Sequence, residues 1–121
     1  MGRRVIPALL ARGHRVRALV REASQGKLPA ACEPAVGNAL DAGTFAPRVA
    51  PSDTFLQLVG VAHPSPAKAA EFRAVDLASA KASARAAAAA GVSHFIYVSV
   101  AQPAPVMKAY VEARAEGEAA I

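Results

Sequence analysis

The chain has 121 residues, which is enough for one domain of modest size and too little for two. Although 54% of the residues are hydrophobic, no apolar run approaches the roughly 20 residues of a membrane helix, so we expect no membrane partner. The single cysteine, Cys32, excludes an internal disulfide and a zinc site built from thiolates, and a reducing, cytoplasmic compartment fits it.

Positive charge is concentrated at the start of the chain. The formal net charge is +5, and the residues before the first acid, Glu22, include Arg3, Arg4, Arg12, Arg15, Arg17 and Arg21. Such a start is open to three interpretations: a transit peptide, a nucleic-acid-binding arm, or the anion-facing edge of a phosphate-binding fold. A transit peptide would be richer in serine, and a nucleic-acid arm would carry interleaved aromatic residues. We therefore favour the phosphate-binding edge and expect no nucleic-acid partner.

The first twenty residues predict a helix followed by a strand. Four apolar residues fall on one helical face, namely Val5, Ile6, Leu9 and Leu10. Gly13 is suited to end this helix, because glycine accepts the left-handed conformation common at that position. Residues 15–20, RVRALV, alternate enough to form a strand, so helix, glycine and strand make half of a β-α-β unit.

The next forty residues predict weaker elements and one clear strand. Residues 24–31 are typical of a loop or a short helical turn, and residues 34–36 of a brief strand. Residues 41–49 predict a weak helix that Pro47 interrupts. Residues 54–61, TFLQLVGV, predict a strand with more certainty, because segments rich in proline, serine and aspartate or histidine bound it on both sides.

The second half of the chain predicts a helix, a strand and a helix. Residues 67–90 are rich in alanine and contain neither glycine nor proline, which predicts one long helix that ends at Gly91. Within it, Asp76 is expected to mark a helix boundary or an exposed face. Residues 92–100, VSHFIYVSV, predict a buried strand, and a last helix is expected from about Met107. Alternating strands and helices predict an α/β fold with a parallel sheet covered on both faces.

Four segments together carry a family resemblance: GRRVIPALLARGHRVRALVR, GNALD, FLQLVGVAHP and AAAAAGVSHFIYVSV. They resemble segments of the short-chain dehydrogenase/reductase superfamily, in particular its atypical and extended members, the NAD-dependent epimerase/dehydratase and NmrA-like proteins. The last segment is the most specific match, and the resemblance runs nearly end to end. It implies a Rossmann-type, doubly wound parallel sheet that holds a nicotinamide dinucleotide.

The same resemblance implies residues that bind the cofactor. Gly2 would be the last glycine of the phosphate-binding G-x-x-G-x-x-G sequence, and Asn38 and Ala39 would border the adenine. The loop beneath the nicotinamide ribose would contain Val59, Gly60 and Val61.

Arg21 bears on the choice between the two nicotinamide cofactors. It comes at the end of the second family strand, where an acid would accept hydrogen bonds from the ribose hydroxyls and a base would pair with the 2′-phosphate. The sequence therefore favours NADP(H) over NAD(H). Arg3 and Arg4, just after Gly2, would add positive potential near the same phosphate. The alternative is a solvated surface position for Arg21 and an exposed first helical turn for Arg3 and Arg4.

The sequence YVEAR stands where the family usually has Y-x-x-x-K, which implies a catalytic group. Tyr110 would exchange the proton, and Ser99, at the end of the preceding strand, would hydrogen-bond the substrate oxygen. Because the pKa of a free tyrosine is about 10, the phenol needs a nearby cation, which Arg114 would supply without being able to relay a proton itself. The structural alternative is that Ser99 ends a strand, Tyr110 packs on the sheet and Arg114 pairs with Glu118.

Two departures from the family pattern concern the ends of the sequence. The chain begins at the third glycine of the fingerprint, so the first family strand, which lies between the second and the fourth, has no counterpart in it. We therefore expect two strand pairs that lack a shared partner. The chain also stops at Ile121, before the family's later strands and its substrate-binding segment. These departures predict a fragment, with residues 1–121 forming part of an NAD(P)-binding Rossmann domain.

The leading hypothesis is an NAD(P)(H)-binding protein with hydride transfer to or from a small carbonyl or alcohol substrate as the family activity. One rival is a non-catalytic dinucleotide-binding sensor or structural subunit of the NmrA-like kind, in which arginine in place of lysine marks the loss of catalysis. Another rival is an inactive truncation. Substrate choice would be made by segments outside this sequence.

Overall fold

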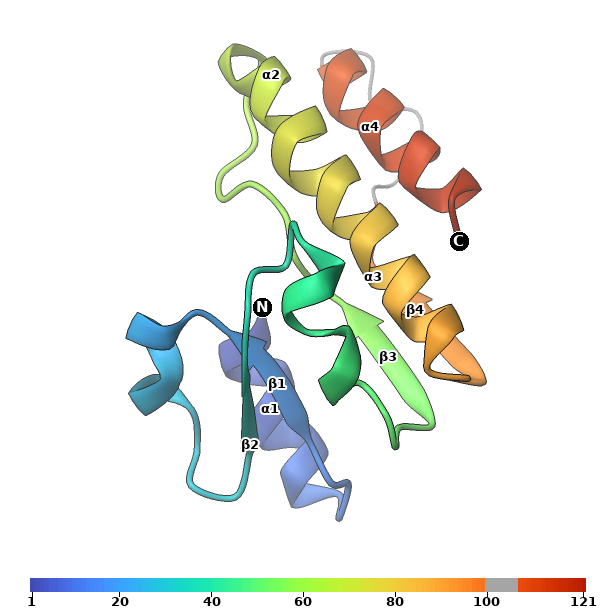
Figure 1. Ribbon diagram of the computed structural model, residues 1–121. Helices are drawn as coiled ribbons and strands as arrows, with labels where there is room; N and C mark the ends of the chain where they lie inside the picture. Colours follow the sequence, from blue (N-terminus) through green and yellow to red (C-terminus); the bar gives the residue numbers. More distant parts are fainter. Residues whose placement is uncertain (100–106) are drawn as a thin grey trace.

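Helices and strands alternate along the chain in the computed structural model, which describes residues 1–99 and 107–121 (Figure 1). The strands are β1 (Arg17–Val20), β2 (Glu33–Val36), β3 (Thr54–Gln57) and β4 (His94–Tyr97). The longer helices are α1 (Gly2–Ala11), α3 (Ala78–Ala89) and α4 (Lys108–Ala119). Gly13, just beyond α1, has a φ of 84°, so it occupies the left-handed region predicted for a helix end. The predicted order of elements is confirmed.

The strands form two parallel pairs instead of one continuous sheet. β1 pairs with β2 from Arg17 opposite Glu33 onward, and β3 pairs with β4 with Phe55 opposite Phe95. In the described part of the chain the two pairs share no hydrogen-bonded strand. Parallel pairing and the division into two pairs both agree with the sequence prediction, whereas a single covered sheet is not observed. Figure 1 shows α1 behind the β1–β2 pair.

Side chains reinforce each pair. Arg17 forms an ion pair with Glu33, 3.0 Å from Nε to Oε1, and its Nη1 donates to the carbonyl oxygen of Arg48 at 2.6 Å. This arginine therefore joins the two strands to the turn that follows them, and its charge is paired with Glu33 instead of facing an anionic ligand. In the other pair, the rings of Phe55 and Phe95 stack with their centroids 5.3 Å apart.

The segment predicted as one long helix changes its winding along its length. It contains a 3₁₀ turn (Pro66–Lys68), a short helix α2 (Ala69–Glu71), a π-helical turn (Phe72–Leu77) and then α3. The π turn was not predicted. Such turns are rare, and they often occur at functional sites. The strands before and after this segment are shorter than predicted: β3 ends at Gln57, and β4 ends at Tyr97. Val100, the last residue of the second predicted strand, lies outside the described residues.

The region predicted as a weak helix forms two 3₁₀ turns, Ala42–Thr44 and Ala46–Arg48, and these help to build the apolar core. Phe45 and Val49 from this region are buried against Ala82 and Ala86 of α3. Alanine on α3 allows the helix to approach closely, so a core with few large side chains is still filled.

Within residues 1–99 and 107–121, no helix combines the length and apolarity needed to cross a bilayer.

Gly117 allows α4 to pack closely against α3 and β4. A Cβ atom at this position would lie 2.6 Å from the hydroxyl oxygen of Tyr97 and 3.3 Å from Cβ of Ala80. The first of these distances is too short for a carbon atom, so the packing of α4 requires glycine here.

We expect Gly117→Ala to destabilise the protein, measured as the free energy of unfolding in urea. In an exposed helix interior this change would stabilise by about 1 kcal/mol, but here overpacking should cost roughly 1–3 kcal/mol and should exceed that gain. Adding Tyr97→Phe, which removes the overlapping oxygen, should recover part of the loss. Gly26→Ala is the control, because nothing lies within 4 Å of its added Cβ. A more stable Gly117→Ala variant would contradict this account of the packing.

Candidate functional site

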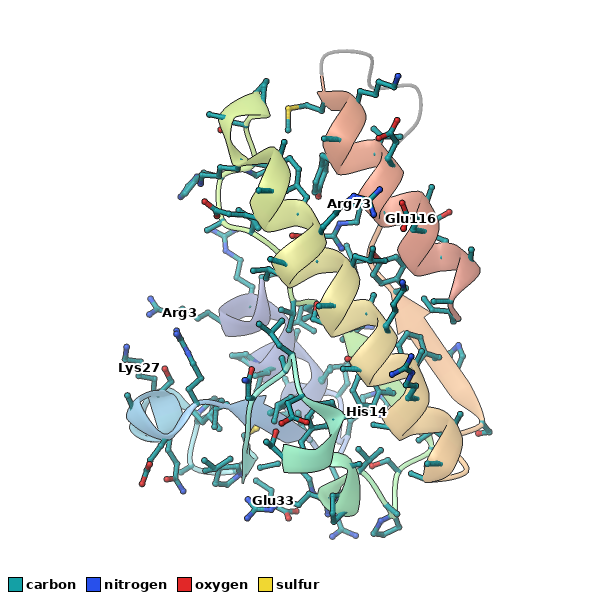
Figure 2. All side chains as sticks on the ribbon, turned by 45° about the horizontal axis from the view of Figure 1, so that its top comes forward. Arg3, His14, Lys27, Glu33, Arg73 and Glu116 are labelled. Atoms are coloured by element: carbon teal, nitrogen blue, oxygen red, sulfur yellow. The ribbon has the colours of Figure 1, made fainter. Side chains whose placement is uncertain are left out.

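A cavity of about 690 Å³ opens between α1, β1 and the 3₁₀ turn η1 (Glu22–Lys27). Three residues predicted to bind the cofactor line it, namely Gly2, Arg3 and Arg21. Lys27, which was not predicted, also lines it, and Figure 2 shows Arg3 and Lys27 on the same side of the molecule. The cavity therefore brings together cationic side chains from three separate elements.

The chemistry of this cavity suits a phosphorylated ligand that also has an apolar part. Its lining in the described part of the chain contains arginine and lysine but no acid. Gly2 begins α1, and the first amides of a helix have no partner within the helix, so this end attracts anions. Ile6, Leu19 and Leu28 supply apolar surface in the same cavity. A nucleotide with a phosphate near the helix end fits these donors.

Asn38 and Ala39 lie in the loop after β2, and neither lines that cavity as the described residues place them. The side-chain oxygen of Asn38 accepts a hydrogen bond from the backbone amide of Leu40 at 3.0 Å, and the backbone amide of Asn38 donates to Oγ1 of Thr44 at 2.8 Å. These bonds shape the turn that leads into Ala42–Thr44. A second, smaller cavity of about 370 Å³ lies between this turn and α3.

Arg114 forms a buried ion pair with Asp76. Nη2 of Arg114 lies 2.5 Å from Oδ1 of Asp76, and only 7% of Arg114 and 0% of Asp76 is exposed. The Nη1 group also donates to the carbonyl oxygen of Val98 at 2.9 Å. The suggested pair between Arg114 and Glu118 is therefore wrong, because a buried guanidinium needs a buried counter-charge and Asp76 supplies it.

Asp76 is the functional candidate that sequence reasoning missed. It was expected at a helix boundary or on an exposed face, but it is fully buried in the π turn. Its second oxygen, Oδ2, accepts a hydrogen bond from the amide of Val61 at 3.0 Å. A lone acid between Val75 and Leu77 was the available signal, since such a residue is buried only when a partner neutralises it.

The predicted nicotinamide loop rests directly on this ion pair. Val59, Gly60 and Val61 are partly buried. A Cβ on Gly60 would lie 2.9 Å from Oδ1 of Asp76 and would overlap Nη2 of Arg114. Glycine is therefore required at position 60 for the loop to approach the two charges.

Tyr97 is a further partner of Arg114. The guanidinium lies 5.5 Å from the ring centroid of Tyr97, and Nη1 makes a long contact of 3.4 Å with its hydroxyl oxygen. Burial raises the pKa of Tyr97, and the nearby guanidinium offsets only part of this effect. Burial alone would lower the pKa of Arg114, but Tyr97 and then Asp76 hold it above its usual value. Arg114 thus remains charged at every pH at which proteins fold.

The predicted catalytic residues are held by different partners. Ser99 donates a hydrogen bond to Oε1 of Glu118 near the end of α4. The ring of Tyr110 packs against Phe72 at 5.0 Å and lies 5.2 Å from the guanidinium of Arg114, which faces the ring and not the phenol oxygen. Among residues 1–99 and 107–121, no hydrogen bond joins Ser99 to Tyr110 or Arg114. Their catalytic roles stay a prediction.

The same described residues hold no group of three histidine, cysteine, aspartate or glutamate side chains placed to bind a metal ion. Cys32 is buried, and burial raises the pKa of its thiol, which disfavours the reactive thiolate.

Comparison with known proteins identifies the family and the fold of the chain. Residues 1–120 match the family model described as NAD(P)H-binding. No curated protein matches the chain. Among solved structures, a short-chain dehydrogenase/reductase superfamily protein from Agrobacterium tumefaciens, with bound NAD, is similar in fold, with a TM-score of 0.70 and 24% sequence identity. The similarity covers 98% of this chain and 40% of that chain, so this chain spans well under half the length of its structural relative.

The structural similarity confirms the Rossmann-type fold that the sequence resemblance implied, and the family match extends over nearly every residue. The chain therefore belongs to the NAD(P)H-binding family and has the fold of short-chain dehydrogenases/reductases.

Proposed function

We propose that this chain binds NADP(H), with the adenosine phosphates in the cavity between α1, β1 and η1. The observation that carries the proposal is the convergence of Arg3, Arg21 and Lys27 around one cavity at the start of α1. Guanidinium and ammonium groups are the side chains that bind phosphate most strongly, and the helix end adds favourable backbone amides. In this proposal Asn38 and Ala39 border the adenine, and the loop of Val59, Gly60 and Val61 lies beneath the nicotinamide ribose.

The preference for NADP(H) over NAD(H) rests on charge. The 2′-phosphate adds about 1.5 to 2 negative charges at neutral pH, which Arg21 and Lys27 would neutralise from adjacent positions. NAD(H) offers only ribose hydroxyls there, and the cavity lining presents no carboxylate to accept their hydrogen bonds.

We expect NADPH to raise the melting temperature of the chain in a thermal-shift titration, and NADH to raise it much less. Arg21→Gln and Lys27→Gln should each weaken NADPH binding by about tenfold, which corresponds to about 1.4 kcal/mol, while NADH binding changes little. Arg12→Gln is the matched control, because Arg12 follows α1 at its other end and is exposed.

The outcomes of this titration separate the two parts of the proposal. Equal affinity for NADPH and NADH in the wild-type chain would overturn the preference for NADP(H). If neither dinucleotide binds, dinucleotide binding by this chain is itself overturned.

Hydride transfer to or from a small carbonyl or alcohol is the first candidate for what the bound dinucleotide does. When bound, a nicotinamide cofactor donates or accepts the hydride. Tyr110 would exchange the proton with the substrate oxygen, Ser99 would hydrogen-bond that oxygen, and Arg114 would supply positive charge. The support for this assignment comes from positions along the chain: Ser99 follows β4, and Tyr110 and Arg114 are one turn apart in α4.

Side-chain geometry favours the second candidate, a non-catalytic dinucleotide-binding sensor or structural subunit. Arg114 is engaged by Asp76 and by the carbonyl of Val98, and Ser99 by Glu118. Groups that are already paired inside the protein are costly to redirect toward a substrate. A guanidinium also cannot relay a proton, which the usual lysine of this position can.

Substituting Arg114 by lysine tests which candidate is correct. A lysine keeps the charge opposite Asp76 and can exchange a proton, and proton transfer by a positioned side chain contributes about 10²–10⁴-fold to a rate. A reductase should therefore gain at least about tenfold in NADPH oxidation with a panel of small aldehydes and ketones. A sensor should gain nothing while it still binds NADPH. Arg73→Lys is the control, because Arg73 also contacts α4 but is exposed.

A further inference from the structure

The carboxylate of Asp76 makes two contacts at once. Oδ1 faces Nη2 of Arg114 at 2.5 Å, and Oδ2 accepts the amide hydrogen of Val61 at 3.0 Å. One side chain in the π turn therefore holds both the loop after β3 and helix α4.

Only a short acid meets both requirements at this position. Oδ1 contacts Nη2 of Arg114 as a charge and makes no hydrogen bond in the described part of the chain, so an asparagine would lose this attraction even if its oxygen kept the bond from Val61. Asp76 has no solvent exposure, so water is not available to replace a lost contact. The charge is also needed, since removal of one partner of a buried ion pair leaves the other uncompensated.

Gly60 shows that the position of the loop after β3 depends on the ion pair between Asp76 and Arg114. Its α-carbon approaches the two charged groups so nearly that an added Cβ would overlap Arg114 and would lie 2.9 Å from Asp76. Displacement of either charged side chain would therefore alter the surface on which the loop rests.

We propose that Asp76 is a positioning residue for the cofactor: its two oxygens fix the loop of Val59, Gly60 and Val61 relative to Arg114 and α4. This inference rests on the proposed function, in which that loop lies beneath the nicotinamide ribose. Asp76 touches no ligand in this arrangement and acts through the backbone of Val61.

The structure provides a matched control pair. Arg73 and Glu116 also join the π turn to α4, with 2.6 Å between Nη2 and Oε1, and Figure 2 shows them facing each other. Their side chains are 59% and 43% exposed, and Asp76, not this pair, holds the amide of Val61. Exposed pairs of this kind contribute little to stability.

The test compares Asp76→Asn with Glu116→Gln by NADPH titration and by hydrogen exchange of backbone amides. Asp76→Asn should weaken NADPH binding by at least about tenfold, because misplacement of a binding loop by an ångström is costly. It should also speed exchange at Val61 and its neighbours while exchange in β1 and β2 stays at the wild-type rate. Glu116→Gln should change neither measurement.

Several outcomes would overturn the inference. Wild-type NADPH affinity in Asp76→Asn would do so, and so would faster exchange spread evenly over the chain. If Asp76→Asn does not fold, the double variant Asp76→Asn/Arg114→Gln decides, because it buries no charge. Wild-type NADPH affinity in the double variant rejects a positioning role. Weakened NADPH affinity together with fast exchange at Val61 supports it. If the wild-type chain binds no dinucleotide, the proposed function fails, while exchange at Val61 still reports whether Asp76 holds the loop.

Discussion

The buried ion pair between Asp76 and Arg114 is the interaction on which the second half of the structure depends. It joins elements that are far apart in sequence: the loop after β3, the π turn and α4. A full charge is tolerated without solvent only when its partner is within contact distance, so the two residues fix each other's positions. Tyr97 and the carbonyl of Val98 complete the surroundings of the guanidinium and bring the end of β4 into the same cluster.

The first half of the structure is organised around positive charge at the surface. Arg3, Arg21 and Lys27 come from the first turn of α1, the end of β1 and the end of η1, and only the fold places them around one cavity. Parallel strands with intervening helices bring helix starts and strand ends to the same edge of a sheet, where anions are usually bound. The family to which residues 1–120 belong is described as NAD(P)H-binding, and the structural similarity confirms the fold that brings these ends together.

Features with a local cause could be predicted from the sequence. The extent of α1, the turn at Gly13 and the strand that became β4 follow from periodicity and glycine. Gly2, Arg3 and Arg21, which were predicted to lie near the cofactor, line one cavity, and their role in binding stays a prediction. Long-range partners could not be predicted in this way. Asp76 and Arg114 belong to different helical segments, and nothing in the spacing of either one identifies the other; the i,i+4 rule suggested Glu118 instead. The π turn, Phe72–Leu77, also escaped prediction, because its sequence FRAVDL contains neither the glycine nor the proline that would have marked a change of winding.

The identity of the cation at position 114 has one more consequence. Burial lowers the pKa of a lysine toward neutrality unless a counter-charge opposes it, whereas a guanidinium keeps its proton in either case, and Tyr97 and Asp76 raise the pKa of Arg114 further although burial opposes them. The charge that Arg114 presents to Asp76 is therefore insensitive to alkalinity. Arginine, standing where the family usually has lysine, therefore keeps a positive charge at the junction between α4 and the loop after β3.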